Sequence, residues 1–203
     1  MVFDPIYLNS DMSVFKTCDW KESYEQGAEA LPLSATPPLV KEVYLRLYVD
    51  SDHTGDKATR QSRTGSFIFL NRAPIIWFSK GQPTAETSVF GAEFVATKNG
   101  MEALRGLRYK LRMMGIPLSG PYFSYGDNML VIHNTQRPES VLKKKYNSVF
   151  YHACRETVVV DEILTSHVPS ENNPDDISTK VLGGGTKCNG LISHLLHDLT
   201  KYV

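Results

Sequence analysis

The stretch Val43-Tyr44-Leu45-Arg46-Leu47-Tyr48-Val49-Asp50 decides how this chain folds. Its odd-numbered residues are aliphatic, and this alternation predicts a β-strand over residues 43–49. Asp50 follows that strand directly. Asp50 and Asp52 share the other parity, so either carboxylate can point into a site at the end of the strand. A turn-forming aspartate is the alternative interpretation of Asp50.

Two more short strands are predicted immediately downstream. Residues 66–70 and 75–79 flank the turn at residues 71–74, so three consecutive antiparallel strands are the simplest arrangement. We expect Trp77, in the third strand, to belong to the core, and the alternative is a platform on which a base stacks.

The rest of the chain alternates helices and strands. Leu104, Leu107, Leu111 and Met114 recur at helical spacing and predict a helix over residues 89–114. Further elements are expected as strands over 122–125 and 162–168, and as helices over 128–134, over 140–158, from Pro174 onward and over 191–199. This order predicts an α/β fold with a mixed sheet flanked by helices.

The chain of 203 residues is long enough for one sizeable core with extensions. We expect residues 1–40, which include a proline-rich stretch, to be an N-terminal extension or linker. Residues 41–183 form the predicted domain, and residues 184–203 form a C-terminal tail with a short helix.

Composition narrows the class of partner. Lys+Arg and Asp+Glu each number 22, so a nucleic-acid binder would need local basic patches. The densest is Lys143, Lys144 and Lys145, which could contact phosphates or form a solvated face. No apolar run is long enough to span a bilayer, and the N-terminus lacks the features of a signal peptide. Three cysteines without metal-ligand spacing predict a reduced, intracellular protein.

Four carboxylates lie at predicted strand ends or helix starts. They are Asp50, Glu93, Asp127 and Asp176. Stepping back from Leu111 places Glu93 on the stripe that faces the sheet. Asp127 joins a strand to a helix, and Asp176 lies two residues after Pro174. Carboxylate oxygens gathered by a folded sheet predict a Mg²⁺ site, and two such ions can cut a phosphodiester bond.

Each of the last three carboxylates has an alternative interpretation. Glu93 could be a surface acid in a first helical turn, and Asp127 could cap a helix. Asp176 could simply stabilise a helix dipole, with Asp175 as an equivalent candidate.

Several stretches carry a resemblance to a known family. In shared order they are residues 48–56, 62–65, 75–84, 92–96, 126–128, 151–156 and 168–180, including Tyr48-Val49-Asp50-Ser51-Asp52, Ala92-Glu93-Phe94, Gly126-Asp127-Asn128 and Asp176-Ile177-Ser178-Thr179-Lys180. Over roughly residues 44–182 the chain resembles the ribonuclease H domain at the C-terminal end of copia-type LTR-retrotransposon polyproteins.

The resemblance implies a ribonuclease H-like fold, with a five-stranded mixed sheet of three antiparallel strands and then two parallel ones, flanked by helices. It implies cleavage of the RNA strand of an RNA–DNA hybrid with two Mg²⁺ ions, or Mn²⁺ in their place. Asp50, Glu93, Asp127 and Asp176 would be the catalytic residues and metal ligands, and Lys143, Lys144 and Lys145 would bind substrate. The implied partners are the hybrid and, formerly, a reverse transcriptase polymerase domain. The implied location is intracellular, in the cytoplasm or in virus-like particles.

The chain departs from the family pattern at four places, one of which is the segment Lys145-Tyr146-Asn147-Ser148, where the family usually has Lys-His-Ile-Asp. Gly91 stands where an additional acid is common, and Gly126 replaces a cysteine. The loop 170–173 lacks the histidine that many relatives carry before the last aspartate. A non-catalytic nucleic-acid-binding or tethering domain is the alternative function. A DNA-cutting, transposase-like nuclease and an unrelated α/β domain are weaker ones.

Overall fold

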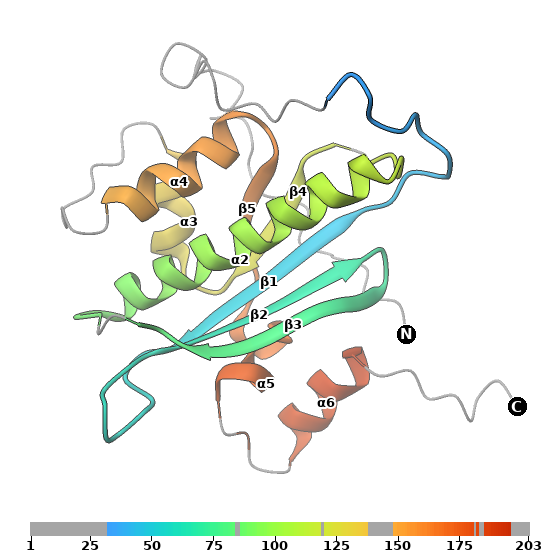
Figure 1. Cartoon of the computed structure of the whole chain (residues 1–203). Helices are drawn as coiled ribbons and strands as arrows, with labels where there is room; N and C mark the ends of the chain where they lie inside the picture. Colours follow the sequence, from blue (N-terminus) through green and yellow to red (C-terminus); the bar gives the residue numbers. More distant parts are fainter. Residues whose placement is uncertain are drawn as a thin grey trace, which may run out of the picture.

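The computed structural model describes residues 32–83, 86–118, 120–137, 148–180, 182 and 185–195. A five-stranded sheet in the order β3-β2-β1-β4-β5 runs through the molecule, with helices on either side (Figure 1). In chain order the elements are β1 (Leu45–Asp52), β2 (Arg63–Leu70), β3 (Ala73–Gly81), α2 (Val89–Met113), β4 (Tyr122–Gly126), α3 (Met129–Gln136), α4 (Ser148–Val159), β5 (Ile163–His167), the 3₁₀ helix η3 (Ser170–Asn172), α5 (Asp176–Thr179) and α6 (Thr186–Leu195).

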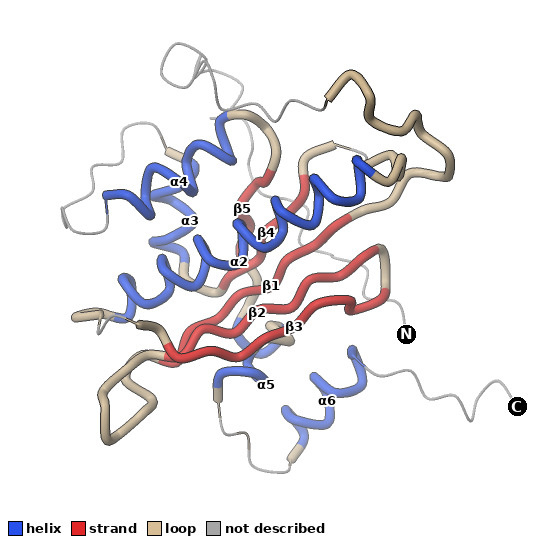
Figure 2. Tube along the Cα trace, viewed as in Figure 1, coloured by secondary structure: helices blue, strands red, loops and turns tan. Residues whose placement is uncertain are grey.

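The strand directions confirm the predicted topology. β1, β2 and β3 pair antiparallel, and β1 with β4 and β4 with β5 pair parallel. Figure 2 shows the five strands side by side, with β1 in the centre. β1 therefore joins the antiparallel half of the sheet to the parallel half.

Both faces of the sheet are covered. α2, α3 and α4 lie over one face, while α5 and α6 lie on the other (Figure 1). The first face holds the larger core cluster, which includes Leu47, Val49, Phe94 and Leu104. The second face holds an aromatic cluster that includes Tyr48, Phe67, Phe69 and Tyr125, against which Leu195 of α6 packs. Because β1 is buried on both sides, a polar residue near its end is shielded from solvent.

Helix α2 presents the predicted apolar stripe to the sheet. Ser88 caps its N-terminus, where the Ser88 hydroxyl accepts a hydrogen bond from the Gly91 N–H at 3.1 Å. Leu104 and Leu111 are buried, as the spacing predicted. The side chain of Glu93 is only 6 % exposed, so its interpretation as a surface acid is wrong.

The structure corrects two expectations about where Asp50 and Asp127 lie in their elements. β1 continues to Asp52, so Asp50 lies within the strand and not after it. Its pairing with Gly65 of β2 explains the extension, because the antiparallel ladder continues to the Asp52–Arg63 pair. Asn128, not Asp127, caps α3: its side chain accepts from the backbone N–H groups of Leu130 and Val131.

Trp77 was expected in the core, and this prediction is wrong. The residue is 63 % exposed, and exposure alternates along β3. β3 is an edge strand, so one set of its side chains faces solvent where none of the described helices covers it. The helix expected from Pro174 begins at Asp176 and spans four residues.

Some predictions fall outside the described residues. These are the structure of residues 1–31, the basic run Lys143–Lys145, the helix over 140–147 and the end of the last helix at 196–199. Residues 32–40 form no helix or strand, and the Leu39 N–H donates to the Gly115 carbonyl at 2.9 Å, while their role as a linker stays a prediction. Within the part of the chain that the structure describes, no helix combines the length and hydropathy needed for a membrane span.

Candidate active site

Three of the four predicted carboxylates meet at one end of the sheet. Each of Asp50, Glu93 and Asp127 offers one carboxylate oxygen, and these three oxygens lie within 4.8 Å of one another. Parallel pairing accounts for part of this arrangement, because Tyr48 of β1 is in register with Tyr125 of β4. Asp50 and Asp127 each follow two residues later and emerge at the same edge. Glu93 reaches them from the first turns of α2.

The carboxylates line an open cavity of about 590 Å³, a size that suits ligand binding. Polar residues of β1 and its following loop form one wall, and the start of α3 forms another. The complete lining is Asp50, Ser51, Asp52, His53, Val89, Glu93, Asp127, Asn128, Met129, Leu130 and Lys180. Val89, Met129 and Leu130 are exposed, so apolar side chains border the acidic centre.

Burial and mutual repulsion make the acidic cluster costly without a cation. Burial, then the neighbouring charges of Asp50 and Asp127, raise the pKa of Glu93 to about 9. Burial raises the pKa of Asp50 to about 6, although the hydrogen bond from Thr179 and the charge of Lys180 oppose this shift. Three hard oxygen donors facing one point are the ligand set that Mg²⁺ and Mn²⁺ prefer, so these residues fit a divalent ion.

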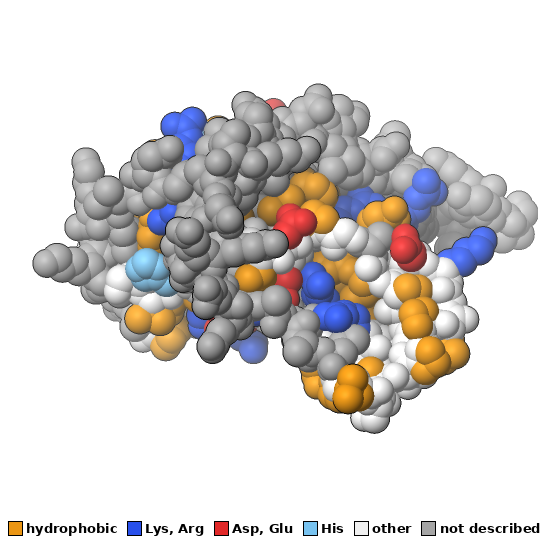
Figure 3. Space-filling view, turned by 90° about the horizontal axis from the view of Figure 1, so that it is seen from above, with side chains coloured by type: hydrophobic (Ala, Val, Ile, Leu, Met, Phe, Trp, Pro, Cys, Tyr) orange, Lys and Arg blue, Asp and Glu red, His pale blue; other side chains and the backbone are white. Residues whose placement is uncertain are grey.

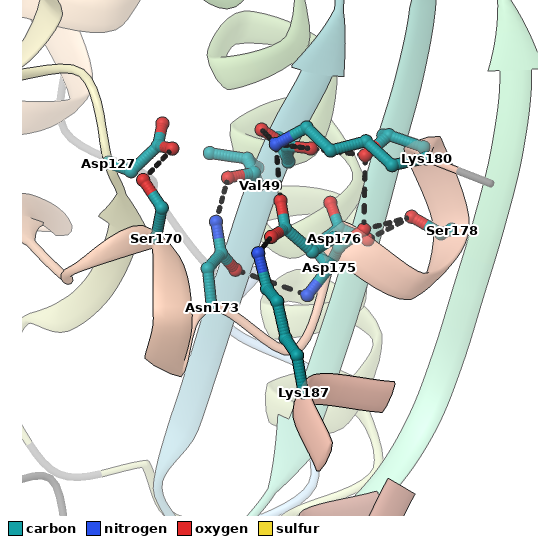
Figure 4. A network of polar contacts seen from close by, with 11 residues as sticks. Val49, Asp127, Ser170, Asn173, Asp175, Asp176, Ser178, Lys180 and Lys187 are labelled. Atoms are coloured by element: carbon teal, nitrogen blue, oxygen red, sulfur yellow. Dashed lines mark hydrogen bonds and ion pairs between the residues drawn. The ribbon is translucent and has the colours of Figure 1, made fainter. Parts of the chain in front are cut away.

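The fourth predicted acid, Asp176, is fully buried and is held differently. One of its carboxylate oxygens accepts a hydrogen bond from the Lys180 ammonium and the other from the Lys187 ammonium. Lys180 also lies 3.2 Å from Asp50 Oδ2, so it stands between the two aspartates. Figure 4 shows both lysine side chains converging on Asp176, while Asp127 lies apart from them. The structure thus brings three acids together and links the fourth to them through a lysine.

Asp175, the alternative to Asp176, takes no part in the three-carboxylate group. It is buried, and its Oδ1 accepts a hydrogen bond from the Ser178 hydroxyl. Burial is the main cause that raises the pKa of Asp175 well above its ordinary value. The hydrogen bond from Ser178 therefore ties the Asp175 side chain to α5, of which Asp175 is the N-cap residue.

Hydrogen bonds from the β5–α5 segment hold the site in place. Asn173 donates to the Val49 carbonyl at 3.0 Å and accepts from the Asp175 N–H at 3.1 Å. The Thr179 hydroxyl donates to Asp50, and the Ser170 hydroxyl donates to Asp127 Oδ2 at 2.7 Å. These contacts tie the segment to β1 and to the end of β4.

Lys180 and Lys187 were not among the predicted site residues. The sequence offers one signal for Lys180, since Asp176 and Lys180 have the i,i+4 spacing of a helical ion pair. It offers none for Lys187, which approaches Asp176 only because α6 folds back beneath the sheet.

Gly65 lets α5 approach the strand opposite Asp50. A Cβ atom at Gly65 would lie 2.8 Å from Asp175 Oδ1 and closer still to Ser178 Oγ and Thr179 Cγ2. We expect Gly65→Ala to displace α5, to destabilise the fold by about 1–3 kcal/mol and to weaken divalent-ion binding. Urea unfolding and Mn²⁺ titration measure the two effects.

Gly106→Ala in α2 is the matched control, because a Cβ atom there would meet nothing within 4 Å. Alanine favours a helix over glycine by up to about 1 kcal/mol, so this variant should be no less stable than the parent. A stable Gly65→Ala protein with unchanged Mn²⁺ affinity would contradict the role assigned to α5.

Surface charge is mixed on one face of the molecule (Figure 3). On the face shown in Figure 3, lysine and arginine side chains are interspersed with aspartates and glutamates. The described residues on that face therefore present no broad patch of one sign.

Comparison with known sequences finds relatives among plant transposons. The chain is 29 % identical over 138 residues, 68 % of its length, to the retrovirus-related Pol polyprotein from transposon RE1 of Arabidopsis thaliana. It is 30 % identical over the same length to that from transposon RE2 of the same plant. It is 28 % identical over 166 residues, 80 % of its length, to that from transposon TNT 1-94 of Nicotiana tabacum. The aligned segments are 9 %, 10 % and 12 % of these polyproteins, so the chain spans about a tenth of their length. No family model matches the chain.

Solved structures with a similar fold are ribonucleases H. RNase H1 from the halophilic archaeon Halobacterium salinarum aligns with a TM-score of 0.52 at 14 % identity, over 66 % of this chain and 93 % of that one. LC11-RNase H1 in complex with an RNA/DNA hybrid aligns with a TM-score of 0.52 at 18 % identity, over 66 % of this chain and 92 % of that one. The N-terminal RNase H domain of rv2228c from Mycobacterium tuberculosis aligns with a TM-score of 0.53 at 13 % identity, over 68 % of this chain and 91 % of that one.

The chain therefore has the ribonuclease H fold, with its acidic cluster at the end of the central strands. Its homologues are retrovirus-related Pol polyproteins from plant transposons, as expected for the ribonuclease H domain of a copia-type polyprotein.

Proposed function

We propose that this chain is a divalent-metal-dependent endoribonuclease that hydrolyses the RNA strand of RNA–DNA hybrids, as part of a retrotransposon reverse transcriptase. The observation that carries the proposal is the gathering of Asp50, Glu93 and Asp127 oxygens within 4.8 Å at an open cavity of a ribonuclease H fold. Support for the substrate comes from LC11-RNase H1, a protein of similar fold whose structure holds an RNA/DNA hybrid.

The residues of the site have distinct tasks in this proposal. Asp50, Glu93 and Asp127 would hold the cation, and Asp176 would act on the site through Lys180. A bound divalent ion would supply charge stabilisation at the scissile phosphate and would ease deprotonation of the attacking water. Glu93 must lose its proton when the ion binds, because burial and its acidic neighbours favour the protonated form in the ion's absence.

Contacts to substrate would come from the rim of the cavity. Asn128, Met129 and Leu130 lie at the start of α3 beside Asp127, where a nucleic-acid backbone could pass. Preference for RNA would come from contacts to 2′-hydroxyls in the shallow minor groove of the hybrid. Lys143, Lys144 and Lys145 remain proposed phosphate contacts, and location in the cytoplasm or in virus-like particles remains a prediction.

A cleavage assay tests the proposal. The chain is incubated with an end-labelled RNA–DNA hybrid, with duplex DNA and with duplex RNA of the same sequence, in Mg²⁺, in Mn²⁺ and in EDTA. We expect internal cuts in the RNA strand of the hybrid alone, and no cleavage in EDTA. Tight hybrid binding without cleavage under any condition would instead favour the non-catalytic tethering function, and equal cutting of duplex DNA would favour a transposase-like nuclease.

A further inference from the structure

We propose that Lys180 is a resident cation of this site, so that the site takes one divalent ion, held by Asp50, Glu93 and Asp127, where two would otherwise bind. This inference rests on the proposed function and deepens it. It concerns the place between the first and fourth acids, which a side chain of the protein itself occupies.

The geometry of Lys180 is that of a bridging cation. Its ammonium lies 3.2 Å from Asp50 Oδ2 and 3.5 Å from Asp50 Oδ1, and it hydrogen-bonds to Asp176 Oδ1. Figure 4 shows the extended side chain lying across Asp176 toward the end of β1. Asp50 and Asp176 come from strand and helix positions 126 residues apart in the sequence, and Lys180 joins them at one point.

The backbone holds the lysine in this position. Lys180 is the C-cap residue of α5, and its N–H donates to the Asp176 carbonyl at 3.0 Å. The preceding residue, Thr179, donates its hydroxyl to the same Asp50 carboxylate. Two successive residues of one short segment, Thr179 and Lys180, therefore contact the Asp50 carboxylate.

The charge of Lys180 opposes binding of a second ion. A lysine ammonium is charged at neutral pH, since its ordinary pKa is about 10.4. A second divalent ion between Asp50 and Asp176 would lie beside this ammonium and be repelled by it. Both oxygens of Asp176 are already engaged, one by Lys180 and one by Lys187. The three clustered carboxylates, in contrast, have a shared centre at which one ion can bind.

Lys187 offers a matched control. It carries the same charge and contacts the same aspartate as Lys180, but the only carboxylate it is seen to pair with in the described part of the chain is Asp176. Removing its charge leaves the bridge between Asp50 and Asp176 intact. A change in ion binding that occurs only when Lys180 is replaced is therefore due to loss of the Lys180 bridge between Asp50 and Asp176, and not to loss of a positive charge in general.

Counting bound ions tests the proposal. Mn²⁺ binding to the full chain is measured by electron paramagnetic resonance, for the parent protein and for Lys180→Gln, Lys180→Arg and Lys187→Gln. We expect one ion for the parent, Lys180→Arg and Lys187→Gln, and two for Lys180→Gln, in which Asp50 and Asp176 lose their contacts with the Lys180 ammonium. Lys180→Arg keeps the charge, so it stays informative even where Lys180→Gln folds poorly.

A second measurement, made with the hybrid present, is how the cleavage rate depends on Mg²⁺ concentration. Below saturation, the parent rate should rise with the first power of Mg²⁺ concentration, and the Lys180→Gln rate should approach the second power. Two ions bound to the parent, or one bound to a folded Lys180→Gln protein, would overturn the resident-cation proposal while leaving hybrid cleavage intact. A parent chain that binds no Mn²⁺ and cuts no hybrid would overturn both proposals.

Discussion

Asp50→Asn is expected to lower the rate of hybrid cleavage at least about a thousandfold, which corresponds to several kcal/mol of lost transition-state stabilisation. Asp50 is the acid at which the site's contacts converge. It belongs to the three-carboxylate group, it accepts from Thr179, and it pairs with Lys180. The amide keeps the shape of the side chain but removes the negative charge that a divalent ion requires. Single-turnover cleavage of a labelled hybrid measures the loss.

Asp52→Asn provides the control for that experiment. Asp52 lies on the same strand and lines the same cavity, but it is not a member of the three-carboxylate group. We expect its rate to stay within a few-fold of the parent rate. Equal losses in the two variants would indicate a general effect of charge at the cavity, and a fully active Asp50→Asn protein would remove Asp50 from the mechanism.

Glu93→Gln is expected to change how stability depends on pH in the absence of metal. The pKa of Glu93 is about 9 in the folded protein, against an ordinary value of 4.5, and burial is the main cause. The folded state therefore holds the proton more firmly than the unfolded state. The stability that this provides is fully present below about pH 4.5 and is lost as the pH rises through about 9.

The parent chain in EDTA should accordingly lose free energy of unfolding as the pH rises from about 6 to 9. Each unit of pKa shift corresponds to about 1.4 kcal/mol, so Glu93→Gln should be more stable than the parent at pH 9 by more than about 2 kcal/mol. Urea unfolding across this pH range measures the difference. Saturating Mg²⁺ should restore the parent's stability at high pH, because the ion neutralises the carboxylates.

Glu102→Gln, on the same helix, is the control for the pH experiment. Glu102 lies in an exposed ion pair with Lys98, away from the acidic cluster. The free energy of unfolding of Glu102→Gln should change with pH in the same way as that of the parent. If Glu93→Gln also ran parallel to the parent between pH 6 and 9, the buried-acid account of Glu93 would be wrong.

Much of the fold could be predicted because its signals are local. Alternation in residues 43–49 marks β1, and the spacing of Leu104, Leu107 and Leu111 marks α2. The same stripe placed Glu93 on the buried face, where the structure has it. Such a periodicity shows which face of a helix or strand is buried, although it does not show which other element packs against that face.

Other features depended on how the elements pack. The sheet order makes β3 an edge strand, so Trp77 is exposed despite its apolar character. Asp50 lies inside β1 because its antiparallel partner continues past Gly65. Neither result follows from the residues' own preferences, since each is set by a partner strand.

The amino-acid sequence by itself determined the order of strands and helices and named four candidate acids, of which three lie together at the end of the sheet. Only the tertiary structure decided the contacts of Asp176, whose role as a fourth metal ligand stays a prediction. Packing α5 and α6 beneath the sheet brings two ammonium groups onto that buried carboxylate. A buried carboxylate needs a positive charge nearby. Lys187 lies 11 residues after Asp176 in the sequence, and only the folded arrangement of α5 and α6 brings it into contact with Asp176.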